Sequence, residues 1–274
     1  MSGRLGLSSY AYSWASRPWQ TESGAGLTPE ALVHKAAARG LTAVQICDNL
    51  PLSVLGQARL ADLASLARDK SILLEVGARG LDAGSLQSHI HIANTLGARV
   101  LRIVPGANGE AQGDVDLERV ADVLRGLLPL CREQNVTLAI ENHFTIRDEE
   151  LLRLVQDIGD EFLGVCLDTA NSTGLLEKPL DTVSTLAPYV VSLHLKDFVI
   201  TKAAHGYRIC GTALGQGCLD APAVVELISQ AGRSPNAFIE LWMEPIGTWE
   251  DTVHKEDEWV RESIAYARGT LRLH

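Results

Sequence analysis

The sequence of 274 residues lacks several features that define common protein classes. It contains no run of about 20 apolar residues, which argues against a membrane-spanning helix. Its first residues, Met-Ser-Gly-Arg, lack the apolar core of a signal peptide. The five cysteines are odd in number and include no Cys-x-x-Cys pair, which argues against a disulfide framework or a zinc knuckle. We therefore expect a protein of the reducing cytoplasm with no membrane partner.

Positive charge is also scarce, because 24 Lys and Arg residues stand against 34 Asp and Glu residues, for a formal net charge of −10. An acidic surface repels phosphate backbones, so no nucleic-acid partner is expected. Linkers, low-complexity tracts and internal repeats are absent, and 46% of the residues are hydrophobic. This length and composition predict one large domain spanning residues 1–274.

Short apolar runs alternate with segments of helical period along the chain. Strands are predicted at residues 4–9, 43–48, 72–77, 99–104, 137–141, 163–168, 190–194 and 237–242. Helices are predicted at residues 29–39, 60–68, 83–96, 115–133, 148–158, 180–187, 221–231 and 252–268. Eight alternating units of this kind close most naturally into a single-domain α/β fold, the (β/α)8 TIM barrel. A doubly wound open sheet is the alternative, but no Gly-x-Gly-x-x-Gly turn follows the first strand.

Local signals mark several of these boundaries. Thr28 precedes Pro29 at a predicted helix start, and Gly40, Gly97 and Gly232 follow helices, where a left-handed cap needs no Cβ. Residues 198–219 contain four glycines and show no clear period. We expect this stretch to form a long loop over the active face, after the seventh strand.

One acid or base closes a short apolar run in each of the last four predicted strands: Glu141, Asp168, His194 and Glu240. The C-terminal strand ends form the active-site face of such barrels, so these side chains are expected to converge. Three carboxylates with one imidazole suit Mn²⁺, Mg²⁺ or Co²⁺ better than a structural zinc site does. The alternative is that these acids cap helices or face solvent, and Asp168 has the clearest capping position.

The motifs around these residues are similar to those of a known family. They read Ile-Glu-Asn-His at 140–143, Leu-Asp-Thr-Ala-Asn at 167–171, His-Leu-Lys-Asp at 194–197 and Ile-Glu-Leu-Trp at 239–242. The segment 211–220 resembles a Gly-Glu-Gly-x-x-Asp loop, and Leu-Gly-Leu-Ser-Ser-Tyr at 5–10 also fits. Across nearly its whole length, the chain resembles the sugar phosphate isomerase/epimerase superfamily, whose members have xylose isomerase-like TIM barrels.

The resemblance implies one divalent cation, with Mn²⁺ first and Mg²⁺, Co²⁺ or Zn²⁺ as alternatives, held by Glu141, Asp168, His194 and Glu240. It also implies a small-molecule carbohydrate substrate, namely a ketose, a sugar acid or a polyol ketone. Glu141 and Glu240 would be the acid–base pair of an isomerase or epimerase. One would remove a proton to give a metal-stabilised enediolate, and the other would return a proton. Barrels of this class commonly pair, so a homodimer is compatible with the sequence.

Two departures from the family pattern keep a second reaction open. Asn171 stands where many relatives have a substrate-binding histidine, and Gln216 stands where many have a glutamate. A neutral amide can hydrogen-bond a hydroxyl but cannot transfer protons at neutral pH. The alternative is a metal-dependent lyase of the same fold, either a decarboxylase of a 3-oxo sugar acid or an inosose-type dehydratase. Lys196, Arg102 or Arg208 would then hold the substrate carboxylate.

Other residues are expected to complete the substrate shell, beside Asn171. His143 and Lys196 follow metal-ligand candidates by two positions and so face the same cavity, although a structural histidine and a Lys196–Asp197 salt bridge are the alternatives. Arg102 lies in an apolar strand and must be paired, with Glu75 or with an anionic substrate group. Arg208 fits a sugar contact or a solvated loop position. Aromatic side chains are expected to wall the cavity or to form a dimer contact: Tyr10, Tyr12, Trp14, Trp19 and Trp242.

Two further functions are compatible with the motifs. An apurinic-site endonuclease of the same superfamily needs extra ligands for three zinc ions and a basic DNA-binding face, and the net charge argues against it. A sugar-binding barrel that retains the site without turnover is the non-catalytic alternative.

Overall fold

The protein is described by a computed structural model that covers residues 3–17, 26–106 and 115–274. Eight parallel strands form a closed barrel in the order β1-β10-β7-β6-β5-β4-β3-β2. Their bounds are β1 Leu5–Ser8, β2 Ala43–Ile46, β3 Leu73–Arg79, β4 Val100–Val104, β5 Thr137–Glu141, β6 Leu163–Asp168, β7 Val190–Leu195 and β10 Asn236–Ile239. Pairing of β1 with β10 closes the sheet, which confirms the predicted (β/α)8 TIM barrel.

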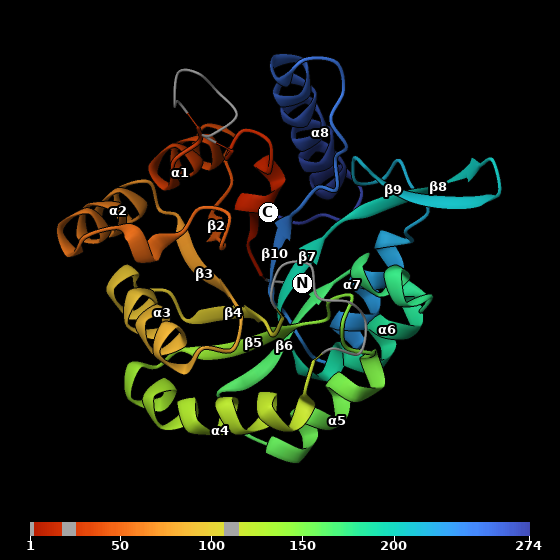
Figure 1. Ribbon diagram of the computed structural model, residues 1–274. Coiled ribbons are helices and arrows are strands. Elements are labelled where there is room, and N and C mark those ends of the chain that lie inside the picture. Colours follow the sequence, from red (N-terminus) through yellow and green to blue (C-terminus); the bar gives the residue numbers. More distant parts are fainter. Residues whose placement is uncertain (1–2, 18–25, 107–114) are drawn as a thin grey trace.

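Eight α-helices surround the barrel as an outer ring (Figure 1). Their bounds are α1 Pro29–Ala38, α2 Gln57–Asp69, α3 Ala83–Leu96, α4 Leu117–Gln134, α5 Asp148–Ile158, α6 Pro179–Leu186, α7 Ala221–Gln230 and α8 Trp249–Gly269. The predicted caps are present, since the Thr28 side chain accepts a hydrogen bond from the Ala31 N–H and Gly97 has φ 70°. None of the helices in the described ranges is both long and apolar enough to span a membrane.

The prediction of a long loop at residues 198–219 is wrong in part. Strands β8 (Asp197–Ala203) and β9 (Gly206–Thr212) pair as an antiparallel hairpin, which extends outward beyond the helix ring (Figure 1). The glycines suggested a loop, but they serve other needs. Gly206 turns the chain with φ 154°, while a Cβ on Gly211 would lie 2.0 Å from the carbonyl oxygen of Trp242.

Asp197 organises the segment between β9 and α7. Its buried carboxylate accepts backbone hydrogen bonds from Phe198, Gly215, Gly217 and Leu219, at 2.8–3.1 Å. Gly217 has no room for a side chain, because a Cβ there would lie 2.2 Å from Asp197 Oδ1. The segment is therefore a fixed support beside the barrel mouth, built around one carboxylate.

Candidate active site

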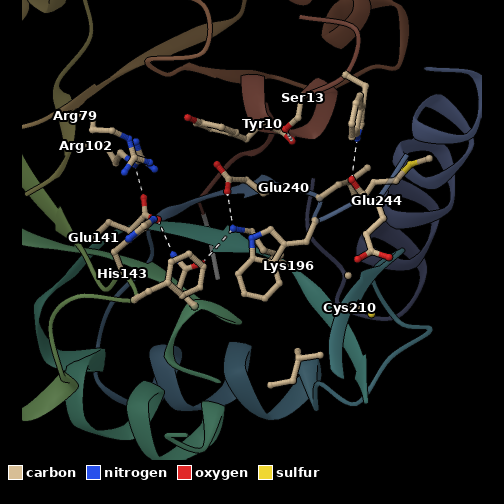
Figure 2. A pocket seen from close by; sticks show the side chains of 18 of the residues that line it. Tyr10, Ser13, Arg79, Arg102, Glu141, His143, Lys196, Cys210, Glu240 and Glu244 are labelled. Atoms are coloured by element: carbon tan, nitrogen blue, oxygen red, sulfur yellow. Dashed lines mark hydrogen bonds and ion pairs between the residues drawn. The ribbon is translucent and has the colours of Figure 1, made fainter. Parts of the chain in front are cut away.

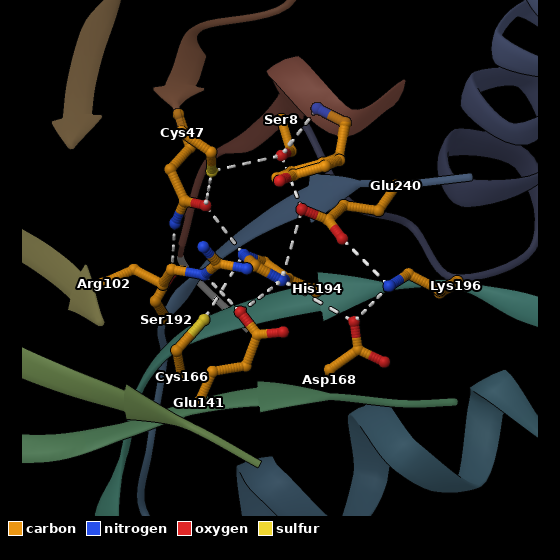
Figure 3. A network of polar contacts seen from close by, with 12 residues as sticks. Ser8, Cys47, Arg102, Glu141, Cys166, Asp168, Ser192, His194, Lys196 and Glu240 are labelled. Carbon is orange, nitrogen blue, oxygen red and sulfur yellow. Dashed lines mark hydrogen bonds and ion pairs between the residues drawn. The ribbon is translucent and has the colours of Figure 1, made fainter. Parts of the chain in front are cut away.

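The structure brings Glu141, Asp168, His194 and Glu240 together at the C-terminal mouth of the barrel (Figure 3). The Nδ1 atom of His194 lies 3.6 Å from Glu141 Oε2, 3.7 Å from Asp168 Oδ2 and 3.4 Å from Glu240 Oε1. All four residues are at most 2% exposed. Glu141 and Asp168 end β5 and β6, His194 lies on β7, and Glu240 directly follows β10.

Buried groups of both signs determine the charges in this cluster. Burial raises the pKa of Asp168, but Lys196 and His194 lower it by more than burial raises it. The net pKa lies below the usual value, so the carboxyl stays ionised. Glu240 follows the same balance, and its pKa is lowered by His194 and Lys196. Burial lowers the pKa of His194, while acidic neighbours that include Glu240 and Glu141 raise it well above the usual value. The cluster therefore favours positive charge at the point where its side chains meet.

The donor set fits a divalent cation. Buried His194 Nδ1 has no hydrogen-bond partner among the described residues, and neither has Asp168 Oδ2 beyond an ion pair with Lys196. Ligand atoms of Asp168, His194 and Glu240 lie within 4.8 Å of one another, and so do those of Glu141, Cys166 and His194. Burial raises the pKa of Cys166, which keeps its thiol neutral and a poorer ligand than a carboxylate. An oxygen-rich set with one imidazole suits Mn²⁺ or Mg²⁺.

A chain of hydrogen bonds below the cluster orients the imidazole. His194 Nε2 donates to Gln45 Oε1 at 2.8 Å, because the Gln45 amide nitrogen already donates to Glu75 at 3.1 Å. Glu75 also accepts from Ser192 at 2.8 Å and from Asn236 at 2.8 Å. The lone pair that remains for a metal is therefore the one on Nδ1. The sequence interpretation missed Gln45, which lies inside an apolar run without an obvious motif.

The prediction that Glu75 pairs with Arg102 is wrong. Arg102 lies level with Gly77 in the β3–β4 register, so Glu75 lies two residues deeper in the barrel and bonds to the network below His194. Arg102 instead forms ion pairs with Glu141 through Nε and with Asp48 through Nη1, the latter at 3.0 Å. Glu75 is 1% exposed and does not line the cavity, so it has no direct access to a substrate there.

Lys196 lies directly against the carboxylate cluster. Its Nζ is 2.8 Å from Asp168 Oδ2 and 3.0 Å from Glu240 Oε2, and it is 4.9 Å from the ring centroid of Trp242. Burial lowers the pKa of Lys196, but Asp168 and Glu240 raise it above the usual value, so the ammonium stays charged. The alternative salt bridge with Asp197 does not form, because Asp197 is occupied by backbone N–H groups.

Asn171 contacts both the cluster and Lys196. Its amide nitrogen donates to Glu141 Oε1 at 2.8 Å, and its Oδ1 accepts from Lys196 Nζ at 3.4 Å. Asn171 is 1% exposed but lines the cavity. The residue that departs from the family pattern therefore binds one ligand candidate and the nearby lysine at the same time.

A cavity of about 680 Å³ opens above these groups (Figure 2). One wall is aromatic, since the His143 and Phe144 rings pack edge-on at 4.5 Å and Phe144 stacks on Trp242 at 5.4 Å. Burial lowers the pKa of His143 to about 4, which leaves a neutral imidazole. Tyr10 and Trp14 also line the cavity, whereas Tyr12 is buried and hydrogen-bonds Asp257. Trp19 lies outside the described residues.

One predicted substrate-binding residue, Arg208, and one departure from the family pattern, Gln216, lie away from the cavity. The Arg208 side chain on β9 is 63% exposed and pairs with Glu244 at 3.5 Å. Gln216 is exposed and donates to Glu262 at 2.9 Å. Neither residue is among those that line the cavity, so the hairpin places Arg208 at the rim of the molecule. Periodicity could not show this, because it does not report where a hairpin points.

Comparison with known proteins gives consistent matches. A family model described as xylose isomerase-like TIM barrel matches residues 33–269. The chain is 32% identical over 264 residues to 3-oxo-isoapionate decarboxylase of Pectobacterium atrosepticum, covering 96% of this chain and 94% of that protein. It resembles a crystal structure of D-psicose 3-epimerase in the presence of D-fructose, with TM-score 0.74 and 16% identity over 98% of this chain and 99% of that one. A xylose isomerase-like TIM barrel protein of Mycobacterium smegmatis in complex with magnesium gives TM-score 0.71 and 11% identity, over 96% and 97% of the chains.

Proposed function

The chain belongs to the xylose isomerase-like TIM barrel family, and on that premise we propose that it is a metal-dependent decarboxylase of a 3-oxo sugar acid. The relative that supports this choice is the 3-oxo-isoapionate decarboxylase, which aligns over nearly the whole chain at 32% identity. Between epimerisation and decarboxylation, the ion pairs of Glu141 and Glu240 also favour decarboxylation. Our first expectation, an isomerase or epimerase, is retained as the alternative.

The metal set of the proposal consists of Glu141, Asp168, His194 and Glu240. A divalent cation bound there would act as a Lewis acid on the substrate carbonyl. Two residues next to the metal set hold its side chains in place by hydrogen bonds. Gln45 fixes which nitrogen of His194 faces the set, and Asn171 fixes the Glu141 carboxylate.

The observation that carries the proposal is that both glutamates are neutralised by cations. Glu141 pairs with Arg102 and accepts from Asn171, while Glu240 accepts from Ser8 and pairs with Lys196. His194 and Lys196 lower the pKa of Glu240, which makes this carboxylate a weak base, and epimerisation needs two groups that exchange protons with carbon. Decarboxylation needs no base, because the electron pair of the broken C–C bond remains on the substrate as an enolate.

We assign to Lys196 the proton that completes the reaction. The ammonium lies beside Asp168 and Glu240, two members of the metal set, and a cation bound by these carboxylates would weaken their hold on its proton. Loss of CO₂ leaves one electron pair on the former α-carbon. Lys196 donates one proton to that carbon and regains one from water. The aromatic wall of His143, Phe144 and Trp242 gives the released apolar CO₂ a dry surface.

The alternative, epimerisation, has one observation in its favour. Glu141 and Glu240 approach His194 from opposite sides (Figure 3), as two proton-exchanging groups must. Protein loaded with Mn²⁺ and incubated in D₂O with 3-oxo sugar acids and ketoses separates the two reactions. We expect CO₂ release with one solvent deuterium in the product. Solvent deuterium in a ketose without loss of carbon would instead establish the epimerase.

The Lys196→Met substitution tests the assigned proton donor. We expect kcat to fall about 10²–10⁴-fold, the usual contribution of a general acid, while Mn²⁺ still binds. Lys202→Met is the matched control, because Lys202 is exposed on β8. An unchanged kcat in Lys196→Met would show that the proton comes from elsewhere.

A further inference from the structure

Two arginines stand together on the β3–β4 wall of the cavity, and the steps proposed above give neither of them a contact with the substrate. Arg79 ends β3, Arg102 lies on β4, and both line the cavity. Figure 2 shows the two side chains on the same wall, beside Glu141. Two guanidinium groups repel each other, so their proximity requires negative charge nearby.

Asp48, directly beyond β2, supplies part of that charge. It accepts from Arg79 Nε at 3.1 Å, from Arg102 Nη1 at 3.0 Å and from the Tyr10 hydroxyl at 2.9 Å. One carboxylate balances one of the two guanidinium charges. The second anion beside Arg102 is Glu141, whose charge is shared with the proposed metal. The wall therefore keeps an attraction for one more anion.

A charge balance over the site leads to the same result. The inner cations are Arg79, Arg102 and Lys196, and the carboxylates that pair with them are Asp48, Glu141, Asp168 and Glu240. A divalent ion in the metal set brings the positive charges to five against four negative charges. Burial raises the pKa of the deeper Glu75, which favours its neutral form, and at the rim, outside this balance, Glu244 pairs with Arg208 and Arg17 lies over the Trp14 ring. One positive charge remains, and a monoanion balances it.

We propose that Arg79, held in place by Asp48 and adjacent to Arg102, binds the carboxylate of a sugar-acid substrate. This inference rests on the proposed function and assigns the part of the site that recognises the acid. A guanidinium matches the two oxygens of a carboxylate with parallel N–H groups, and acids of the described chain engage only the Nε of Arg79. Two other cations expected to hold the carboxylate are less suited to that contact. Lys196 is paired with Asp168 and Glu240, and Arg208 lies outside the cavity.

The proposed contact predicts a particular kinetic signature. The carboxylate is charged in the bound substrate and loses its charge as CO₂ departs. An ion pair with Arg79 therefore stabilises the bound substrate more than the transition state. Such a contact lowers KM without raising kcat, so its removal raises KM and leaves kcat unchanged or higher.

Arg79→Met in the Mn²⁺-loaded protein tests this inference. We expect KM for a 3-oxo sugar acid to rise at least about tenfold with kcat unchanged or higher. Competitive binding of an aldonate with the same number of carbons should weaken by a similar factor, whereas its neutral amide should bind equally to both proteins. Arg79→Lys keeps the positive charge but lacks the two parallel N–H groups of the guanidinium, so its KM and its aldonate affinity should lie between those of the wild type and Arg79→Met. This variant also provides the test if Arg79→Met does not fold. Arg59→Met is the control, because Arg59 pairs with Glu30 outside the barrel.

Three results would overturn the inference: unchanged aldonate affinity in folded Arg79→Met, the same loss from Arg17→Met in place of Arg79→Met, or Arg79-dependent binding of phosphorylated ketoses but not of aldonates. The proposed function fails separately. If no substrate releases CO₂ while aldonates bind in an Arg79-dependent manner, the acid subsite stands and the decarboxylase does not.

Discussion

A buried imidazole can offer a metal only one nitrogen at a time, and Gln45 decides which nitrogen of His194 is available. The Gln45 oxygen accepts a hydrogen bond from the His194 Nε2–H, and the hydrogen bond from the Gln45 amide nitrogen to Glu75 prevents the amide from flipping. The lone pair on Nδ1 then faces the three carboxylates. Residues that make no contact with the metal can therefore control its affinity.

We expect Gln45→Leu to weaken Mn²⁺ binding about 10–100-fold, the usual effect of losing such a supporting hydrogen bond. The substitution removes the acceptor of the His194 Nε2 proton and leaves Glu75 with one donor fewer. Titration calorimetry measures the affinity, and nitrogen NMR of the His194 ring reports the tautomer. Gln216→Leu, at an exposed position, is the control and should bind Mn²⁺ normally. Equal affinities of the two variants would refute the positioning role of Gln45.

At the residue scale, position along a strand was enough to predict that Glu141 and Asp168 lie close together, as they do around His194. Glu141 and Asp168 end apolar runs, and the ends of parallel strands converge in any barrel. Prediction from the sequence failed for Arg102, whose partner depends on strand register. Apolar patterning reveals the order of strands, but it does not show that Arg102 lies level with Gly77 rather than with Glu75.

At the scale of elements, helix α8 holds the segment after β1 in place. The buried Glu256 carboxylate accepts the backbone N–H groups of Trp14 at 2.8 Å and Ala15 at 3.1 Å. The Trp14 indole donates to the Met243 carbonyl at 2.8 Å. Trp14 lines the cavity, so one acid on a distant helix positions part of its wall.

Glu256 also predicts how stability depends on pH. Burial raises its pKa to about 7 from 4.5, although Trp14 and Ala15 oppose the rise. Below pH 4.5 the group is protonated in both the folded and the unfolded chain. Between pH 4.5 and 7 unfolding releases a proton, so the contribution of this group to stability falls as pH rises, by about 3 kcal/mol in total.

Urea unfolding of the wild type and of Glu256→Gln, which cannot titrate, measures this effect. Other groups titrate equally in both proteins and cancel. We expect the free energy of unfolding of the wild type, relative to the variant, to fall by about 3 kcal/mol between pH 4.5 and pH 7.5. A difference that stays constant with pH would show that the Glu256 carboxyl is solvated.

The segment between β9 and α7 depends on Asp197 in the same manner. Asp197→Asn replaces one acceptor oxygen by an amide group that faces N–H donors. We expect a loss of about 1–3 kcal/mol in the free energy of unfolding, the usual cost of an unsatisfied buried donor. Gly217→Ala should be at least as damaging, because its Cβ would meet Asp197 Oδ1 at 2.2 Å. Gly56→Ala, where a Cβ meets no atom within 4 Å, is the matched control for chemical denaturation.

At the scale of the whole molecule, repetition made the fold predictable. Strand β5 and helices α3 and α5 begin and end at the predicted residues, because apolar period and caps agree in those units. The β8–β9 hairpin interrupts that repetition and was interpreted as a loop. Its glycines suit a turn at Gly206 and a close approach of Gly211 to Trp242, which are tertiary demands that a single sequence does not display.

The barrel brings three carboxylates together around His194, and its stability should respond to a cation that binds them all. A metal bound only by the folded chain adds about 2.7 kcal/mol at a free concentration of 100 times Kd. For a chain of this size that corresponds to a rise in Tm of about 5–10 °C. We expect this rise on adding Mn²⁺ to chelator-treated protein, with one ion bound per chain. Glu240→Gln removes one donor charge and should reduce the rise strongly, whereas the exposed Glu226→Gln should not. Three ions per chain, or an equal rise in Glu240→Gln, would contradict a single site built by these four strands.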